Sequence, residues 1–378
     1  SITIIQAFQR FDTGTFMALD IVIMAAGKGT RMKSRHPKVL HRLAGRPLLD
    51  HVLATTSALP AHRCWVITGH GADAVESAIA GSGAQPVRQM PQRGTGHAVQ
   101  QVVPHLADVD APGSTTLILN GDVPLIAAGT AQALVDACGG TRLALLTIVL
   151  PDATGYGRIV RAGGSADGAV LGIVEHKDAT PAQRQIREVY TGMMAAPTAL
   201  LRRWVMALTD DNAQKEFYLT DIVAMAVAEG VPVVASQAAD ETEVLGVNSP
   251  LQLADLERRF QRRQADALLE AGVRLADPAR FDLRGTLTAG QDVDIDVGCV
   301  FEGTVALGDD VRIGAHCVLR DAVIGNGAVI HPFTHIEGAR VGAGALIGPY
   351  ARLRPGADLA DEVHIGNFVE VKNSTLAK

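Results

Sequence analysis

The C-terminal third of the sequence repeats with a period of six residues, and this period constrains the fold more than any other feature. An aliphatic residue or Phe recurs at every sixth position from Ile295 onward, with two slips of one residue. The positions are Ile295, Phe301, Leu307, Ile313, Leu319, Ile324, Ile330, Ile336, Val341, Ile347, Leu353, Leu359, Ile365 and Val371. Neither an α-helix nor a simple sheet has this period, whereas hexapeptide repeats are typical of a parallel β-helix. We therefore predict a β-helix whose aliphatic side chains stack in a narrow core.

Glycine directly follows six of these repeat positions, at residues 308, 314, 325, 342, 348 and 366. We expect the coils to turn at these glycines, because glycine reaches backbone angles that other residues avoid. If three hexads form one coil, Cys299 and Cys317 lie one above the other. A ladder of two small apolar thiols is the expected arrangement, and a disulfide is the alternative.

The sequence from Leu19 to about Val247 alternates short aliphatic runs with segments of helical period. This pattern predicts an α/β fold with a mainly parallel sheet, whose expected strands are residues 21–24, 64–68, 116–119, 143–150 and 231–235. A helix of about twenty residues should follow, because Ser249 suits an N-cap, Pro250 the first helical position and Gly272 the end. We expect four parts: residues 1–17 as a leader or extension outside the fold, 18–248 as the α/β domain, 249–272 as a linker helix and 273–378 as the β-helix.

Composition argues against several classes of protein. The 34 basic and 40 acidic residues give a net charge of -6, and 47% of the residues are hydrophobic, so we expect neither a disordered nor a nucleic-acid-coating chain. The longest nearly continuous apolar run, residues 143–150, is far shorter than the roughly 20 residues that cross a bilayer. Four scattered cysteines without a CxxC pair indicate a reducing, cytoplasmic setting. We expect no nucleic-acid partner and no membrane.

The first expected strand runs into a loop of small and basic residues, 25–32 (AAGKGTRM). Small residues there let backbone N–H groups approach a phosphate closely. The loop lacks the third glycine of a dinucleotide fingerprint, where Met32 stands, and the Ser or Thr of a P-loop, where Gly29 stands. Residues 27–38 contain five cations and no acid, which indicates a polyphosphate ligand, with a solvated surface loop as the alternative. The five are Lys28, Arg31, Lys33, Arg35 and Lys38.

A second motif, residues 117–125 (LILNGDVPL), places Asp122 at the carboxyl end of an expected strand. Ligands of open α/β sheets bind at this edge. A carboxylate beside a polyphosphate suits Mg²⁺, which takes one or two carboxylates together with substrate oxygens and water. The alternative is an Asp that only caps the next turn.

Taken in order, these and other motifs resemble a known family of enzymes. Residues 25–32 followed by 37–40 (PKVL) resemble the signature of sugar-phosphate nucleotidyltransferases. The resemblance narrows with Gln89, with residues 94–98, 121–125, 154–158, 174–179, 218–221 and 246–248, and with 352–356 and 364–370 in the repeats. From Met17 to Lys378 the chain is similar to the bacterial bifunctional N-acetylglucosamine-1-phosphate uridyltransferase and glucosamine-1-phosphate acetyltransferase.

The resemblance implies a Rossmann-like nucleotidyltransferase domain, a linker helix and a left-handed parallel β-helix. It implies Mg²⁺-dependent transfer of UMP from UTP to N-acetylglucosamine-1-phosphate, which yields pyrophosphate and UDP-N-acetylglucosamine, a precursor of peptidoglycan and lipopolysaccharide. The family also transfers acetyl from acetyl-CoA to glucosamine-1-phosphate in a homotrimer. Because the sequence stops at Lys378, before the family's catalytic His, we expect a C-terminally truncated member with an incomplete β-helix and no acetyl transfer.

The resemblance also implies roles for individual residues. The nucleotide pocket would consist of Met24, Ala25, Ala26, Gly27, Lys38, Gln89, Gly94 and Thr95. The sugar pocket would consist of Asn120, Gly121, Gly157, Glu175, Tyr190 and Asn248. Asp122 and Asn248 would hold the Mg²⁺, while Arg31, Lys38 and Asp122 would be catalytic. In the repeats, Arg354 and Lys372 would bind the sugar phosphate of the acetyl acceptor.

The reaction that this resemblance implies needs no nucleophile from the protein. A phosphate oxygen of the sugar phosphate attacks the α-phosphorus of UTP in line, so positioning and charge neutralisation supply the catalysis. The histidines of the repeats are therefore expected to be surface or turn residues rather than catalytic ones. They are His316, His331, His335 and His364.

Two positions depart from the family pattern. Tyr190 stands where the family commonly has Asn, a change that bears on sugar selectivity, and Asn120 stands where some relatives have Tyr. One alternative function is nucleotidyl transfer with another pair of nucleoside triphosphate and sugar phosphate. Another is a non-catalytic regulatory protein that binds nucleotide-sugars. The presence of Arg31, Lys38, Asp122 and Asn248 argues against it.

Overall fold

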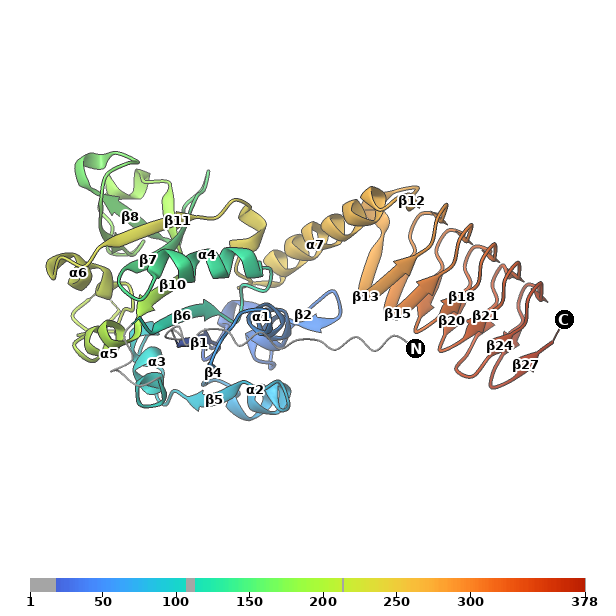
Figure 1. Ribbon diagram of the computed structural model, residues 1–378, viewed down its shortest axis with the longest axis horizontal. Helices are drawn as coiled ribbons and strands as arrows, with labels where there is room; N and C mark the ends of the chain where they lie inside the picture. Colours follow the sequence, from blue (N-terminus) through green and yellow to red (C-terminus); the bar gives the residue numbers. More distant parts are fainter. Residues whose placement is uncertain (1–17, 107–112, 213, 378) are drawn as a thin grey trace, which may run out of the picture. The chain divides into compact units, whose positions relative to one another are not determined.

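The computed structural model describes residues 18–106, 113–212 and 214–377. They form two compact units (Figure 1). The first comprises the described part of residues 1–40 together with Leu48–Gly246, and the second comprises His41–Pro47 together with the chain from Val247 onward. The expected leader, residues 1–17, lies outside the described residues, and the expected domain boundaries stay predictions.

The first unit is built on one nine-stranded sheet flanked by helices (Figure 1). Its main path runs β11-β7-β10-β6-β1-β4-β5, and β8 and β9 continue from β10. The strands are β1 (Leu19–Met24), β4 (Arg63–Thr68), β5 (Gln85–Arg88), β6 (Thr115–Asn120), β7 (Leu143–Val149), β8 (Gly157–Arg161), β9 (Val170–Val174), β10 (Glu188–Pro197) and β11 (Val233–Gln237). The helices are α1 (Leu48–Ser57), α2 (Ala72–Ile79), α3 (Thr95–Val102), α4 (Ala128–Cys138), α5 (Thr198–Met206) and α6 (Asp221–Ala228).

Along its main path the sheet is mainly parallel, as predicted, and the antiparallel strand β10 is the exception that the sequence did not reveal. All five expected strands are present as β1, β4, β6, β7 and β11, and β1 pairs in parallel with both β4 and β6. Strand β10, however, lies antiparallel between β6 and β7. The sequence concealed this strand because Thr191 and Gly192 interrupt its apolar run, and its register shifts between Tyr190 and Met194.

Alternate side chains of the central strands enter two separate cores, one on each face of the sheet. Ile21 and Ile23 of β1 pack in the core that contains residues of α1, α2 and α4. Val22, between them, packs in the core that contains residues of α3, α5 and α6. Strand side chains alternate between faces, so helices on both faces bury the central strands and leave the carboxyl edge of the sheet as the place for a ligand.

The second unit begins with the expected helix, α7 (Pro250–Glu270). The Ser249 hydroxyl caps it by accepting a hydrogen bond from Gln252 N, and Pro250 occupies the first turn, as predicted. A short hairpin, β2 (Arg42–Leu43) and β3 (Arg46–Pro47), belongs to this unit, because Ala44 N donates to Glu257 Oε2 at 2.7 Å. Among the described residues, no helix has the length and apolarity needed to cross a membrane.

The remainder of the second unit is a parallel β-helix of hexapeptide repeats, as predicted, and Figure 1 shows its coils stacked in succession. From β13 onward, paired strands lie 17 or 18 residues apart, as in Ile313 with Ile330 and Ile347 with Ile365, so three hexads make one coil. All of the repeat positions predicted from the sequence are buried in one core. The strands are β12 (Arg274–Leu275), β13 (Asp282–Ala289), β14 (Asp294–Ile295), β15 (Val300–Leu307), β16 (Arg312–Ile313), β17 (Val318–Arg320), β18 (Val323–Ile324), β19 (Val329–Ile330), β20 (His335–Glu337), β21 (Arg340–Val341), β22 (Leu346–Ile347), β23 (Arg352–Leu353), β24 (Asp358–Leu359), β25 (His364–Ile365), β26 (Glu370–Val371) and β27 (Thr375–Leu376).

The glycines of the repeats serve close packing more than turning, which corrects the expectation that the coils turn at them. A Cβ on Gly314 would lie 2.7 Å from Pro332, a distance that real Cβ atoms do not show. Of the six glycines only Gly348 has a left-handed backbone (φ 91°), and further left-handed angles lie at His316 (φ 60°), Phe333 (φ 61°) and Tyr350 (φ 55°). The rings of these three residues stack, with centroid distances of 5.2 Å between His316 and Phe333 and 5.0 Å between Phe333 and Tyr350. His316 is therefore a turn residue, as predicted.

Cys299 and Cys317 form the expected ladder of free thiols rather than a disulfide. Each thiol donates to a backbone carbonyl 3.2 Å away, that of Gly314 for Cys299 and that of His331 for Cys317. Burial raises the pKa of Cys299 to about 11 and that of Cys317 to about 12. Both thiols are therefore neutral at physiological pH.

We expect iodoacetamide to leave these two cysteines unmodified in the folded protein at pH 8. The thiolate is the reactive form, and a pKa of about 11 leaves only about 10⁻³ of the Cys299 thiol ionised at that pH. Mass spectrometry of tryptic peptides would measure the modification, with guanidinium-unfolded protein as the control that reacts fully. Rapid alkylation of either residue in the folded protein would contradict the buried ladder.

Candidate active site

A hollow of about 430 Å³ lies at the carboxyl ends of β1 and β6 in the first unit. We call it the first hollow. Its walls come from the loop after β1, the start of α3 and the segment after β6. The lining residues are Met24, Ala25, Ala26, Gly27, Lys28, Lys38, Val39, Gln89, Gln92, Gly94, Thr95, Ala98, Asn120, Asp122 and Glu216. The hollow is thus at the sheet edge where open α/β folds bind ligands.

The loop after β1 is held to its neighbours by backbone hydrogen bonds. Ala25 N donates to Ile67 O at 2.9 Å, and Gly121 N donates to Met24 O at 3.0 Å. Gly29 has a left-handed backbone, with φ 58°, and a Cβ there would lie 2.7 Å from the Cβ of Lys38. Glycine is therefore needed at position 29 for both its angles and its small size, and it lets the loop pack directly against Lys38.

Lys38 and Asp122 form an ion pair in the wall of the first hollow, between Nζ and Oδ2. Lys38 belongs to a short helix, η2 (Lys38–Leu40), while Asp122 follows the end of β6. Their side chains are 14% and 18% exposed, so both are only partly reached by water. The hollow therefore holds a cation suited to phosphate beside a carboxylate suited to a divalent metal.

The opposite wall is built around Gln89, which is 3% exposed. Its Nε2 donates to Gly94 O at 2.9 Å and lies 3.1 Å from His97 Nδ1. Burial lowers the pKa of His97, followed in effect by the charge of Arg93, and this favours the neutral ring. Gly94 has φ 104°, and a Cβ there would lie 2.6 Å from the carbonyl oxygen of Phe217. These contacts hold the start of α3 in the wall.

A second hollow, of about 220 Å³, shares Met24, Thr95 and Asn120 with the first, so the two are contiguous. Its other lining residues are Gly155, Tyr156, Gly157, Glu175, Tyr190, Thr191, Gly192, Leu219 and Thr220. The Thr220 hydroxyl donates to Glu175 Oε1 at 3.1 Å. Burial raises the pKa of Glu175, and the hydrogen bond fixes the orientation of its carboxyl group.

Two glycines give the second hollow its room. A Cβ on Gly157 would lie 2.7 Å from Ile173 and 3.6 Å from both oxygens of Glu175. A Cβ on Gly192, which has φ 88°, would lie 2.2 Å from the side-chain nitrogen of Asn120. Gly157 therefore leaves room for Ile173, and Gly192 leaves room for the amide group of Asn120.

Two known domain families match successive parts of this chain. The family of MobA-like NTP transferase domains matches residues 21–275, and the family of GMPPB C-terminal domains matches residues 283–377. The bifunctional protein GlmU of Methylibium petroleiphilum is 74% identical over 364 residues, which cover 95% of this chain and 78% of that protein. The chain belongs to the bifunctional GlmU family.

A second relative of the same name agrees with this membership. GlmU of Paracidovorax citrulli is 63% identical over 378 residues, covering 96% of this chain and 78% of that protein. Among solved structures, a nucleotidyl transferase from Methanothermobacter thermautotroptrophicus covers 65% of this chain and 99% of its own, at 19% identity and a TM-score of 0.44.

GlmU membership confirms the family expected from the motifs and the enzyme class, a nucleotidyltransferase. The predicted function, uridylyl transfer to N-acetylglucosamine-1-phosphate with acetyl transfer as the family's second activity, agrees with it. The expectations of C-terminal truncation and of lost acetyl transfer stay predictions.

The structure brings most of the expected site residues together. All eight residues expected for the nucleotide line the first hollow: Met24, Ala25, Ala26, Gly27, Lys38, Gln89, Gly94 and Thr95. Of those expected for the sugar, Asn120, Gly157, Glu175 and Tyr190 line the second hollow. Their roles as ligands of substrate stay predictions until they are tested.

Several expected residues lie elsewhere. Arg31, in the short helix η1 (Thr30–Met32), is exposed and lines neither hollow. Gly121 is buried behind the first hollow, where a Cβ would lie 3.2 Å from Val39. Asn248 belongs to the second unit, where its backbone N–H donates to Gln252 Oε1 at 2.9 Å. In the β-helix, Arg354 donates to Glu370 Oε1 at 3.1 Å, and Lys372 is exposed.

Sequence reasoning missed Gln92 and Glu216 in the first hollow and Thr220 in the second. Gln92 and Glu216 stand outside the motifs that carried the resemblance. Thr220 stands inside one, residues 218–221, and its hydroxyl would be an obvious partner for a buried carboxylate. Only the fold shows that this carboxylate is Glu175.

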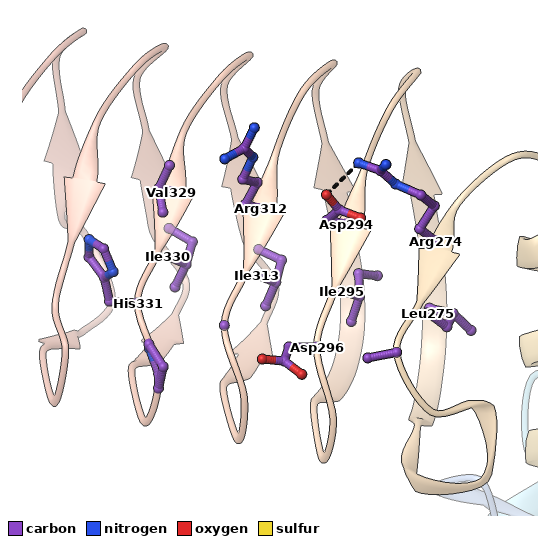
Figure 2. A pocket seen from close by; sticks show the side chains of 13 residues that line it. Arg274, Leu275, Asp294, Ile295, Asp296, Arg312, Ile313, Val329, Ile330 and His331 are labelled. Carbon is purple, nitrogen blue, oxygen red and sulfur yellow. Dashed lines mark hydrogen bonds and ion pairs between the residues drawn. The ribbon is translucent and has the colours of Figure 1, made fainter.

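A further hollow, of about 390 Å³, lies on one sheet of the β-helix (Figure 2). Figure 2 shows Arg274 paired with Asp294 above a row of isoleucines, and the Nη2–Oδ2 distance is 2.5 Å. The row stacks Ile295, Ile313 and Ile330 from successive coils. Arg274 and Asp294 of its rim already pair with each other, and the chemistry of nucleotidyl transfer lies in the first unit.

Proposed function

We propose that the first unit transfers UMP from UTP to N-acetylglucosamine-1-phosphate, with release of pyrophosphate. The observation that carries this proposal is the junction of two hollows at Met24, Thr95 and Asn120. One hollow contains a lysine and a carboxylate, and the other contains the half-buried carboxyl group of Glu175 among hydroxyls. A nucleotide and a sugar phosphate placed in them would meet at the junction.

The nucleotide base and ribose would occupy the wall formed by Gln89, Gly94 and Thr95, and the phosphates would lie along the loop after β1. Lys38 lines this hollow beside Lys28. The ammonium of Lys38 pairs with Asp122 and has three N–H donors, so it can also donate to a phosphate oxygen of the nucleotide.

The residues present fit a divalent metal. Mg²⁺ takes few protein carboxylates, with substrate oxygens and water completing its shell, and Asp122 offers such a carboxylate beside the phosphate loop. No cluster of three or more His, Cys, Asp or Glu that could hold a metal occurs in the described part of the chain, and a substrate-bound Mg²⁺ needs none. Bound Mg²⁺ would neutralise charge on the phosphate oxygens. The role of Asn248 as a second ligand stays a prediction.

The protein's own contribution to the reaction is positioning. A phosphate oxygen of the sugar phosphate forms a bond to the α-phosphorus of UTP while the bond from that phosphorus to the bridging oxygen of pyrophosphate breaks. Lys38 would offset the negative charge of the phosphates, and Glu175 would accept a hydrogen bond from a sugar hydroxyl. Holding both substrates at the junction makes the encounter effectively intramolecular.

For the β-helix we propose the family's arrangement, a homotrimer in which Arg354 and Lys372 hold the phosphate of glucosamine-1-phosphate and acetyl-CoA is the co-substrate. Sedimentation of the purified chain tests the oligomeric state, and a well-behaved monomer would contradict the trimer. A cytoplasmic location also stays part of this proposal.

We expect the purified chain to release pyrophosphate when mixed with Mg²⁺, UTP and N-acetylglucosamine-1-phosphate. A coupled pyrophosphate assay would follow the rate, with ATP, dTTP and glucose-1-phosphate as control substrates. A clear preference for the ATP or glucose-1-phosphate pair would replace the proposed substrates with another nucleotide and sugar. No release with any pair would instead favour a protein that binds nucleotide-sugars without turnover.

A further inference from the structure

Arg158 on β8 is a buried arginine whose charge has no carboxylate partner. Its side chain is 2% exposed, which places it among the largest fully buried side chains of the described residues. Within the same part of the chain it forms no ion pair, and its Nε is screened from water without a hydrogen-bond partner. Buried charges are normally paired, because a charge that leaves water loses solvation energy. An unpaired buried guanidinium therefore calls for an explanation.

The guanidinium holds the turn that precedes β8, residues 152–156. Its Nη1 donates to Tyr156 O, near the end of this turn, at 2.5 Å. Its charge also acts on Asp152 at the start of the turn. Hydrogen bonds from Thr154 lower the pKa of Asp152, and the positive charge of Arg158 adds to this effect. Arg158 thus acts on the turn at both ends.

Packing from outside does not hold this turn. Gly155 within it is exposed and has a left-handed backbone, with φ 87°. A Cβ at this position would meet no atom within 4 Å, so no neighbouring segment presses on the turn there. The hydrogen bond from Arg158 approaches from the interior, where it can fix the direction of the Tyr156 carbonyl.

The turn forms part of the wall of the second hollow, whereas Arg158 itself lies on the other face of the sheet. Residues 155–157 line this hollow, and Arg158 lines neither hollow. Gly157 pairs with Tyr190, whose ring packs in the core on one face, and Arg158 pairs with Val189, which packs in the core on the other. Strand side chains alternate between faces. Arg158 can therefore act on a ligand of this hollow only through the turn.

Stability alone does not account for a guanidinium at this position. Apolar side chains of similar volume often replace buried charged groups without loss of stability, and Val189 opposite Arg158 already belongs to an apolar core. An apolar side chain cannot donate to a carbonyl, however. The feature that only a polar side chain supplies here is the orientation of the turn.

We propose that Arg158 is a positioning residue for the sugar phosphate, which keeps the wall of residues 155–157 in the conformation that the substrate needs. This inference rests on the proposed function and adds no contact with the substrate. Rates depend on reacting atoms being held in the right geometry, and a small displacement of a supporting segment lowers them strongly.

The main test is Arg158→Met, which removes the charge and the hydrogen bond and keeps most of the volume. We expect kcat/KM for N-acetylglucosamine-1-phosphate to fall roughly ten- to a hundredfold, with a higher KM for this substrate. The KM for UTP should stay unchanged, because residues 155–157 do not line the first hollow. The Tm should not fall, since an unpaired buried charge is removed.

Arg158→Lys tests the same hydrogen bond by rescue. The ammonium of lysine can donate to Tyr156 O, so this variant should recover part of the loss in kcat/KM. Hydrogen exchange followed by mass spectrometry reports on the turn without any substrate. Amides of residues 153–157 should exchange faster in Arg158→Met than in the unaltered chain.

Arg161→Met is the matched control. Arg161 lies on the same strand and lines neither hollow, and its Nε lies 2.6 Å from Oε2 of Glu188. Its replacement leaves Glu188 without this partner, so the Tm should fall. Both KM values should stay as in the unaltered chain, because this ion pair does not hold the turn.

A folded Arg158→Met variant with an unchanged KM for the sugar phosphate would overturn the inference. So would a lower Tm with equal changes in both KM values, which is the result expected of a merely structural residue. If the unaltered chain releases no pyrophosphate, the proposed function is refuted separately. Calorimetric titration with N-acetylglucosamine-1-phosphate then decides: weaker binding by Arg158→Met would support the role of Arg158, and equal affinity of both chains, or binding by neither, would refute it.

Discussion

Replacing Asp122 by Asn should reduce pyrophosphate release by about 10³-fold or more, since the variant removes the carboxylate beside the phosphates. Asn keeps the shape of the side chain, so the turn after β6 should persist. The carboxylate is the group suited to a divalent metal, and an amide is a much weaker ligand for Mg²⁺. The rate at saturating UTP, sugar phosphate and Mg²⁺ measures the effect, and Mn²⁺ binding in the presence of UTP measures metal affinity independently.

Asp136→Asn is the matched control for this prediction. Asp136 is an exposed residue of α4 that accepts a hydrogen bond from Gln132 and does not line the hollows. Its replacement should leave the rate and the Mn²⁺ affinity unchanged. An Asp122→Asn variant with near-normal activity would show that Asp122 only caps the turn after β6, the alternative that the sequence left open.

The β-helix could be predicted from the sequence because its rule is strictly local. A buried aliphatic residue at Ile313 predicts another six residues later, at Leu319. The period remained recognisable despite two slips of one residue, and all of the predicted positions are buried. The helix α7 was equally legible, since a cap at Ser249 followed by Pro250 is a signal contained in two residues. Neither prediction required knowledge of distant contacts.

The missed features depend on contacts between distant parts of the chain. Strand β10 is antiparallel because it returns from β8 and β9 and inserts between β6 and β7, and no periodicity reports that insertion. The hairpin His41–Pro47 joins the second unit through Glu257, more than two hundred residues away. In the repeats, Gly314 is needed because Pro332 of the next coil approaches it, and no local signal reveals that approach.

The candidate site divides in the same way. Residues at strand ends, such as Met24 and Asp122, could be placed from the motifs, because parallel strands bring their carboxyl ends to one edge. Glu216 and Thr220 do not belong to a strand of the sheet, so the order of the strands does not indicate that they reach the hollows. Arg31 lies outside the hollows, although the five clustered cations of the sequence gave it the same expected role as Lys38.

Lys38→Ala should reduce the rate of pyrophosphate release by about 10²- to 10³-fold, because the variant loses a cation that offsets phosphate charge. Arg35→Ala is the control: Arg35 belongs to the same cationic stretch but is exposed and lines neither hollow, so its loss should have little effect. Comparable losses in the two variants would mean that the whole basic stretch, and not Lys38, attracts the phosphates.

The double variant Lys38→Ala/Asp122→Asn distinguishes a catalytic pair from a structural one. If the pair only holds the fold, either single change should lower the free energy of unfolding by about 1–3 kcal/mol, because one partly buried charge loses its partner, and the double variant should recover much of it. If both groups act on the phosphates, the double variant should be about as inactive as Asp122→Asn alone, because residues that act as a unit are not additive. Recovery of activity in the double variant would contradict a catalytic role of Lys38 and Asp122, because a gain in stability cannot replace the charges that both changes remove from the phosphate site.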